Sequence, residues 1–275
     1  MKFKTRRVVL TLDQKNQLII DYKNHMRKKD LKTKYYISTS YLNVLLRKAG
    51  FHWSYDMRDR ARKYQTNEKY FDIINTEEKA YWFGFLLADG YISAKKTSWS
   101  VQLRLIDLDA IQKLKLALES SVPIKTIYSD KRKTCYELSI ASKYMVESLG
   151  KYGMVNNKTF RVRIPETIDK KLWPHIIRGY SDGDGCIYVR KDKYQCANFS
   201  ITSSSIEILN QIEKYFQDNN IIKNNRSYIS DYKTYRTINI GTQSEVKDVL
   251  RLLYGQANIY LDRKYKKAHE VLSRI

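Results

Sequence analysis

The sequence lacks the features of a secreted, zinc-binding or membrane-spanning protein. Its 275 residues include three cysteines and four histidines, with no Cys-x-x-Cys and no closely spaced histidine pair. This pattern predicts free thiols in a reducing, intracellular compartment and argues against a zinc site. No apolar run reaches the roughly 18 residues that cross a bilayer, and no apolar signal core follows the basic N-terminus. We therefore expect no membrane partner.

Proline, glycine and acidic residues are also scarce. Three prolines and ten glycines argue against disorder and long flexible linkers. A hydrophobic content of 43% is enough for one large domain or two smaller ones. With 29 acidic against 51 basic residues, the net charge is +22, which favours a polyanionic partner. Nucleic acid is the first candidate for this partner; a membrane surface is the other polyanion considered, and it is not the partner we expect.

The first quarter of the chain is the most basic, with 17 Lys and Arg against 5 Asp and Glu in residues 1–66. Thr11 and Gln14 form a possible capping box. Apolar residues at helical spacing then predict three short helices, the last at about residues 39–48, in a helix-turn-helix-like module. Its outward side chains would face a DNA groove: Thr39, Ser40, Asn43, Arg47 and Lys48. A structural helical bundle with a solvated basic face is the alternative.

A basic linker is expected over residues 51–66. Arg58, Arg60 and Arg62 stand on alternate positions and could lie along phosphates, or could simply be solvated.

Two later segments, residues 82–90 and 177–185, begin 95 positions apart and resemble each other. Each is the end of a predicted helix, with small residues at its third and seventh positions and Asp-Gly at its close. The glycine predicts a left-handed helix cap. A carboxylate beside that cap is disfavoured, because the C-terminal end of a helix carries partial negative charge. Asp89 and Asp184 break this rule at matching places, which marks them as functional candidates.

The same order of elements follows both segments. Apolar and polar residues alternate in residues 99–105 and again in 197–202, which predicts strands with one buried face. A helix, a hairpin and another helix follow in each half. The fold class is therefore α+β, a duplicated αββαββα pseudo-dimer with antiparallel sheets and a small all-α N-terminal domain. The expected domains are residues 1–66, 67–164 and 165–275.

Small residues at four-residue spacing would let the two motif helices pack backbone to backbone: Gly84, Ala88, Gly179 and Gly183. Packed in parallel, the helices would bring Asp89 and Asp184 together. Two carboxylates about 4 Å apart repel by roughly 4 kcal/mol at an effective dielectric of 20. A divalent cation would relieve this repulsion, and oxygen-only ligands near phosphate favour Mg²⁺ over zinc. An EF-hand is excluded, because the twelfth loop position would be Lys191 instead of glutamate.

These segments resemble the paired motifs of the LAGLIDADG homing endonucleases in their single-chain, two-motif form. The resemblance covers about residues 68–275, and the sixth motif position differs between the copies, with Leu87 in one and Asp182 in the other. It implies saddle-shaped sheets over double-stranded DNA. It also implies Mg²⁺, with Mn²⁺ as a substitute, held by Asp89 and Asp184 with help from the carbonyls of Ala88 and Gly183.

The resemblance also implies further site residues. Lys158 and Lys264 match the basic position that polarises water or stabilises phosphate charge, although each could be a solvated lysine. Polar residues that tune the water would lie at about Asp107 and Ser203, and Asp107 could instead cap a helix. The strand faces that would line the DNA, or merely water, are Ser93, Lys95, Ser100, Gln102 and Arg104 in the first half and Tyr188, Arg190, Asn198, Ser200 and Thr202 in the second.

The function expected from the sequence is that of a monomeric, site-specific DNA endonuclease that cuts both strands of a long asymmetric target. An RNA maturase that assists intron splicing and a non-catalytic DNA-binding regulator of the same fold are the alternatives. The presence of both Asp89 and Asp184 argues against the regulator.

Overall fold

The computed structural model describes residues 9–24, 26–51, 63–95, 98–129, 133–190, 196–232 and 234–274. The chain divides into two compact units, Met1–Gln65 and Thr66–Ile275. This boundary lies one residue before the expected one, and the hydroxyls of Thr66 and Ser120 are 2.8 Å apart within the second unit. The linker arginines Arg58, Arg60 and Arg62 lie outside the described residues. No helix in the described part of the chain is long and apolar enough to cross a membrane.

The first unit contains three helices: α1 (Leu12–Lys23), α2 (Lys28–Tyr35) and α3 (Thr39–Lys48). Thr11 and Gln14 form the predicted capping box at the start of α1. The turn between α2 and α3 has no glycine, and Tyr36 adopts the left-handed conformation there with a φ of 52°. Leu18, Leu31 and Leu42 meet in a core that belongs to this unit alone.

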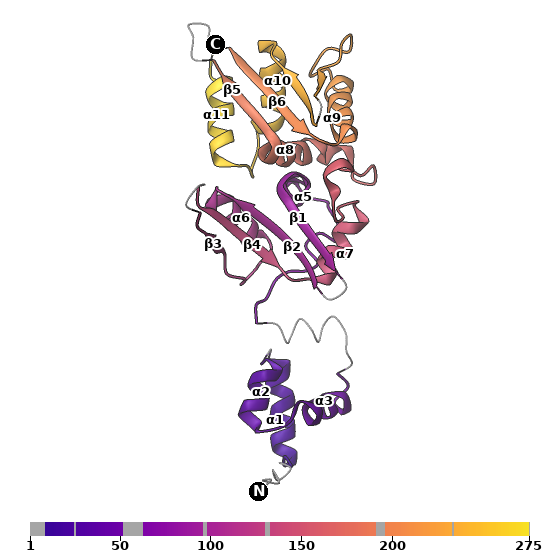
Figure 1. The fold of residues 1–275 in the computed structure, drawn as a ribbon, viewed down its shortest axis with the longest axis vertical. Helices are drawn as coiled ribbons and strands as arrows, with labels where there is room; N and C mark the ends of the chain where they lie inside the picture. The colour runs from indigo at the N-terminus through magenta and orange to yellow at the C-terminus, as the bar shows by residue number, and fades with distance from the viewer. Residues whose placement is uncertain are drawn as a thin grey trace. The chain divides into compact units, whose positions relative to one another are not determined.

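The second unit repeats one set of elements (Figure 1). The first copy consists of α5 (Glu77–Asp89), β1 (Gly90–Lys95), β2 (Ser98–Leu105), α6 (Leu108–Ala117), β3 (Lys125–Ile127), β4 (Cys135–Ile140), α7 (Lys143–Lys151) and the short helix η1 (Lys158–Phe160). The second consists of η2 (Lys170–Leu172), α8 (Trp173–Asp184), β5 (Gly185–Val189), β6 (Ala197–Ser203), α9 (Ile206–Asp218), β7 (Ile229–Asp231), β8 (Arg236–Ile240), α10 (Gln243–Tyr254) and α11 (Asp262–Leu272).

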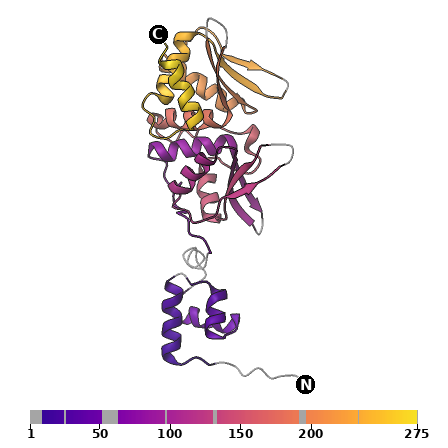
Figure 2. The same cartoon turned by 90° about the vertical axis from the view of Figure 1, so that its left-hand side faces the viewer.

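Each half forms a four-stranded antiparallel sheet, in the orders β1-β2-β4-β3 and β5-β6-β8-β7. Helices α6 and α7 cover one face of the first sheet, and α9 and α10 cover the corresponding face of the second (Figure 2). The predicted duplicated α+β fold is thus confirmed. Inward residues such as Val101, Leu103, Phe199 and Ile201 are buried in one core shared by both halves, and each contributes about 1.5–3 kcal/mol by leaving water.

Helices α5 and α8 lie side by side at the seam between the halves and make the most extensive contact of any two described elements (Figures 1 and 2). A Cβ atom on Gly84 would lie 2.0 Å from the carbonyl oxygen of Ile176, and one on Gly179 would lie 2.0 Å from that of Tyr81. The two backbones are therefore in direct contact at these glycines. This seam sets where the two helix ends meet.

Candidate active site

The two motif helices end at Asp89 and Asp184, and strands β1 and β5 begin at the following glycines. The predicted left-handed caps are wrong, because Gly90 and Gly185 have φ values of −71° and −95° and extended backbones. Glycine is needed here for space. A Cβ on Gly90 would lie 2.5 Å from the carbonyl oxygen of Leu86, and Gly185 has a matching contact. Each chain thus turns straight from helix to strand beside its aspartate.

The carboxylates of Asp89 and Asp184 act on each other across the seam. A Cβ on Gly183 would lie 2.4 Å from the Cβ of Ala88 and 3.1 Å from Oδ2 of Asp89, so Asp89 lies over the residue that precedes Asp184. Both residues are exposed, but protein atoms around the two carboxylates replace part of their hydration. This burial and the nearby charge of Asp184 raise the pKa of Asp89 to about 6.

Two lysines supply the positive charge that the helix ends lack. Lys158 Nζ donates to the carbonyl oxygens of Leu87 at 2.6 Å and Ala88 at 3.0 Å, at the end of α5. Lys264 Nζ donates in the same way at the end of α8, to the carbonyl oxygens of Asp182 at 2.9 Å and Gly185 at 2.6 Å, and to that of Ser181. Neither helix has a basic residue in its own last turn. The basic side chains at these helix ends thus come from lysines about 70 to 80 residues further along the chain.

Each aspartate has its strongest lysine interaction with a lysine from the opposite half of the unit. Burial raises the pKa of Asp184, and the charge of Lys158 is the largest effect opposing it. For Asp89 the largest opposing charge is that of Lys264. We call these pairs, Asp184 with Lys158 and Asp89 with Lys264, the Lys158 centre and the Lys264 centre. A pocket lined by Lys158, Tyr180 and Asp184 opens at the first of them.

Burial also lowers the pKa of each lysine, that of Lys264 to about 8. With a pKa of about 8, the Lys264 ammonium group remains predominantly protonated at neutral pH, where it can balance phosphate charge.

Tyr180 is a polar residue of the Lys158 centre that sequence reasoning missed. Its hydroxyl donates to Oγ of Ser203 at 2.9 Å, and the nearby Tyr180 side chain also helps to lower the pKa of Asp184 against the effect of burial. Burial raises the pKa of Tyr180, so the hydroxyl keeps its proton. The first motif has Phe85 at the same position, and this single difference was the signal available in the sequence.

The two positions expected to tune water are not equivalent in the repeat. Gly90 pairs with Leu103 and Gly185 pairs with Ile201, so Asp107 corresponds to Ser205 instead of Ser203. Asp107 is the N-cap residue of α6 without a side-chain cap bond, and it accepts from Arg263 Nε at 3.2 Å. This ion pair joins the halves beside the Lys264 centre.

The candidate DNA-contact residues of the first half share the sheet face opposite the core. Ser93 pairs with Ser100, and Gln102 and Arg104 follow on alternate positions, with Lys95 at the strand end. Ser93 and Ser100 are largely covered at 8% and 7% exposure. Arg104 forms an ion pair with Glu137 at 2.6 Å. The same face also presents residues that the sequence reading did not select: Tyr91, Ser98, Lys125, Glu137 and Ser139.

The second half presents a nearly uncharged face. Tyr188 pairs with Asn198, Cys186 with Ser200, and the hydroxyls of Thr202 and Thr237 are 3.1 Å apart. Arg190 lies exposed just past the end of β5. The sequence reading missed Thr237 and Asn239, which β8 adds to the same face.

In the first unit, the candidate groove residues lie along α3. Thr39 and Ser40 are exposed in its first turn, and Arg47 and Lys48 are exposed in its last. Asn43 is half-buried and accepts a hydrogen bond from Lys28 Nζ at 2.8 Å.

The donor set at the seam fits a hard divalent cation. It comprises the carboxylates of Asp89 and Asp184, with the carbonyls of Gly183 and Ala88 next to them in the chain; the Ala88 oxygen has only one lone pair left, because it accepts from Lys158 Nζ at 3.0 Å. All are oxygen donors, as magnesium prefers. The described residues include no cluster of three or more His, Cys, Asp or Glu that could hold a metal. A cation here would therefore depend on backbone, water or substrate oxygens for its remaining ligands.

The protein is pseudo-twofold: its two αββαββα halves share one helix seam. The acidic and basic side chains at the end of this seam come from both halves and form a composite site. Both halves match the family model described as a LAGLIDADG-like domain, over residues 76–152 and 175–254. These matches span more than half of the chain, which therefore belongs to the LAGLIDADG-like domain family.

Solved structures share the fold of the second unit. The meganuclease I-CpaMI, bound to uncleaved DNA, has a TM-score of 0.50 and 13% identity over 72% of this chain and 91% of its own. The meganuclease I-SmaMI, bound to uncleavable DNA, has a TM-score of 0.49 and 12% identity over 71% and 90%. A full-length DUF199/WhiA protein from Thermatoga maritima has a TM-score of 0.45 and 17% identity over 75% of this chain and 64% of its own. At these identities the likeness concerns the fold. The search of curated proteins found no match.

Proposed function

We propose that this chain is a site-specific endonuclease that hydrolyses both strands of double-stranded DNA with a divalent metal ion. The observation that carries this proposal is the convergence of Asp89, Asp184, Lys158 and Lys264 at one end of the helix seam, where both lysines bind the carbonyl oxygens of the helix ends that carry the aspartates. Two centres in one chain suit two strands, so a single copy is sufficient. The resemblance in fold to meganucleases that bind DNA supports the same proposal.

Asp89 and Asp184, with the carbonyl oxygens of Ala88 and Gly183, are the groups that would hold the cation. Mg²⁺ suits this oxygen set, and Mn²⁺ should substitute for it. When bound, the cation would stabilise negative charge on the attacking and leaving oxygens. It would also remove the mutual repulsion that raises the pKa of Asp89.

The lysines would act on the scissile phosphates. Hydrolysis joins the oxygen of water to phosphorus and releases one alcohol oxygen of the strand, so negative charge increases on the phosphate oxygens. Lys158 and Lys264 are held by carbonyl oxygens at the helix ends, so their charges are in place before DNA arrives. The buried Lys264 donates to three carbonyl oxygens, so its charge would act on phosphate through space. Such pre-organised charges are worth more for catalysis than mobile ones.

The two sheet faces would contact unlike halves of a target. The first face carries Lys95 together with Arg104 and Lys125, which both pair with Glu137, whereas the second is mostly hydroxyl, amide and Tyr188. Arginine and lysine suit guanine edges and phosphates, and asparagine suits adenine. We therefore expect a long asymmetric target. The basic first unit, with α3 as its reading helix, would extend the contacts further.

The test is cleavage of a linear duplex that carries a target selected from a randomised library. We expect cutting of both strands with Mg²⁺, none with excess chelator, and binding without cutting by Asp184→Asn. Mn²⁺ should restore activity after chelation. Undiminished cutting by Asp184→Asn would remove the metal assignment. A wild-type chain that binds DNA but never cuts it would favour a regulator of the same fold.

A further inference from the structure

The segment 255–261, which joins α10 to α11, controls where α11 begins and therefore where Lys264 lies. Lys264 is in the first turn of α11, three residues after the N-cap residue Leu261. Leu261 offers no side-chain cap. A helix without its own cap depends on other partners to set its start. Here those partners come from both halves of the unit.

Asp182 is the partner that reaches Leu261. Its side chain is 1% exposed and accepts from the backbone N–H of Leu261 at 2.8 Å. The hydroxyls of Tyr254 and Tyr81 donate to the same carboxylate at 2.7 and 2.9 Å. Tyr81 belongs to α5, so this buried carboxylate joins the seam helix of the first half to the start of α11 in the second.

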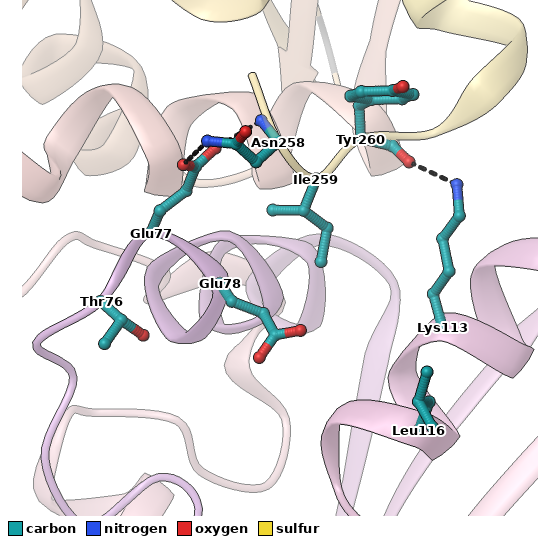
Figure 3. A pocket seen from close by; sticks show the side chains of 8 residues that line it. All are labelled: Thr76, Glu77, Glu78, Lys113, Leu116, Asn258, Ile259 and Tyr260. Carbon is teal, nitrogen blue, oxygen red and sulfur yellow. Dashed lines mark hydrogen bonds between the residues drawn. The ribbon is translucent and has the colours of Figure 1, made fainter. Parts of the chain in front are cut away.

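A second buried group, Arg178, holds the middle of the segment. Its guanidinium donates to the carbonyl oxygens of Ile259 and Leu253, both at 2.9 Å, and to Glu77 Oε1 at 2.6 Å. Glu77 in turn accepts from the backbone N–H and the side-chain amide of Asn258, at 2.9 and 2.8 Å (Figure 3). The segment is thus tied to the first turn of α5.

The first half also holds the end of the segment from outside the seam. Lys113 of α6 donates to the carbonyl oxygen of Tyr260 at 3.3 Å (Figure 3). It also donates to Asp262 at 2.5 Å. Arg263, the neighbour of Lys264, pairs with Asp107 at 3.2 Å. Four residues of the first half therefore take part in placing a lysine of the second: Glu77, Tyr81, Lys113 and Asp107.

Lys158 is held differently. The first motif has Leu87 where the second has Asp182, so the corresponding position offers no polar side chain. The segment before Lys158 is instead anchored by Asn156, which accepts from the backbone N–H of Ala94 at 3.2 Å and donates to its carbonyl oxygen at 3.5 Å, within its own half. Lys158 is half-buried, whereas Lys264 is 6% exposed. The two centres differ in how firmly their lysines are placed.

We propose that Asp182 is a positioning residue that fixes the start of α11, through Leu261, Tyr81 and Tyr254, and thereby sets Lys264 for cleavage of one particular strand. This inference rests on the proposed function, since it requires Lys264 to act in cleavage. A displacement of about 1 Å at a reacting group can cost on the order of 100-fold in rate. Loss of this anchor should therefore slow one strand and spare the other.

The experiment compares Asp182→Asn and Tyr254→Phe with the wild-type chain on a supercoiled plasmid carrying the selected target. Tyr228→Phe is the matched control, because Tyr228 is also a buried tyrosine whose hydroxyl donates to a buried carboxylate, Glu245, at 2.5 Å. The rate on each strand is followed by strand-specific end labels in Mg²⁺, and the melting temperature of every variant is measured.

We expect both Asp182→Asn and Tyr254→Phe to accumulate nicked circles, with the same strand slowed roughly tenfold or more and the other changed less than about twofold. Tyr228→Phe should lower the melting temperature and keep the two rates equal. If a variant cleaves both strands at the wild-type rate, or slows both by the same factor, the positioning role is overturned even though the wild-type chain cuts normally. If Asp182→Asn does not fold, Tyr254→Phe decides between these outcomes. A wild-type chain that cuts neither strand would overturn the proposed function, and this inference with it.

Discussion

Replacing Gly179 by alanine tests the seam on which both centres depend. The added Cβ would lie 2.0 Å from the carbonyl oxygen of Tyr81, whereas a close carbon–oxygen contact needs about 3.3 Å or more. The helices would therefore have to separate by roughly 1.3 Å. Overpacking of this kind costs about 3 kcal/mol in the free energy of unfolding, the upper end of the usual range. The same separation would move Asp184 relative to Asp89, and cleavage should fall about 100-fold.

Gly150 provides the matched control for this substitution. It lies in α7, and a Cβ there would meet nothing within 4 Å. Gly150→Ala should therefore stabilise the chain by about 0.5–1 kcal/mol and leave cleavage unchanged. Urea unfolding and Mg²⁺-dependent cutting are measured for both variants. If Gly179→Ala were as stable and as active as Gly150→Ala, direct backbone contact at the seam would be refuted.

Three further predictions follow from the sites. Folding raises the pKa of Asp89 from 3.8 to about 6, so the folded chain binds more protons than the unfolded chain between these pH values. Without metal, the stability of the wild type relative to Asp89→Asn should therefore fall as the pH rises from about 4 to 6. Tyr180→Phe removes one hydrogen bond at the Lys158 centre and should slow a single strand about 2- to 10-fold, in line with about 0.5–1.5 kcal/mol. Deleting residues 1–65 should weaken DNA binding, flatten its salt dependence and shorten the footprint.

Each of these predictions has an opposing result. A pH-independent difference between the wild type and Asp89→Asn would contradict the raised pKa. Equal slowing of both strands by Tyr180→Phe would show that Tyr180 serves both centres or only the fold. An unchanged footprint after the deletion would contradict groove reading by α3.

The local order of the second unit could be read from the sequence because periodicity is a property of neighbouring residues. Alternation in Trp99–Leu105 and a cap at Thr76 each depend on a few adjacent side chains, and the helix and strands formed where they were expected. The conformation of Gly90 could not be read in this way. Glycine is required here because β1 follows α5 directly and the carbonyl oxygen one turn back in the helix leaves no room for a Cβ atom. A left-handed turn is not the reason.

The sequence by itself determined the duplication, the basic charge and the two misplaced carboxylates, because these are patterns of composition and spacing. Only the tertiary structure decided which positively charged groups lie near those carboxylates. Lys158 and Lys264 reach the helix ends from distant segments, and for Asp89 and Asp184 the lysine charge that lowers the carboxyl pKa most comes from the other half. Asp182, which occupies the motif position that Leu87 has in the first copy, accepts directly from Leu261 at the start of α11 and from Tyr81 on the opposite helix. Burial and distance across the seam create these relations, and neither quantity exists along a linear chain.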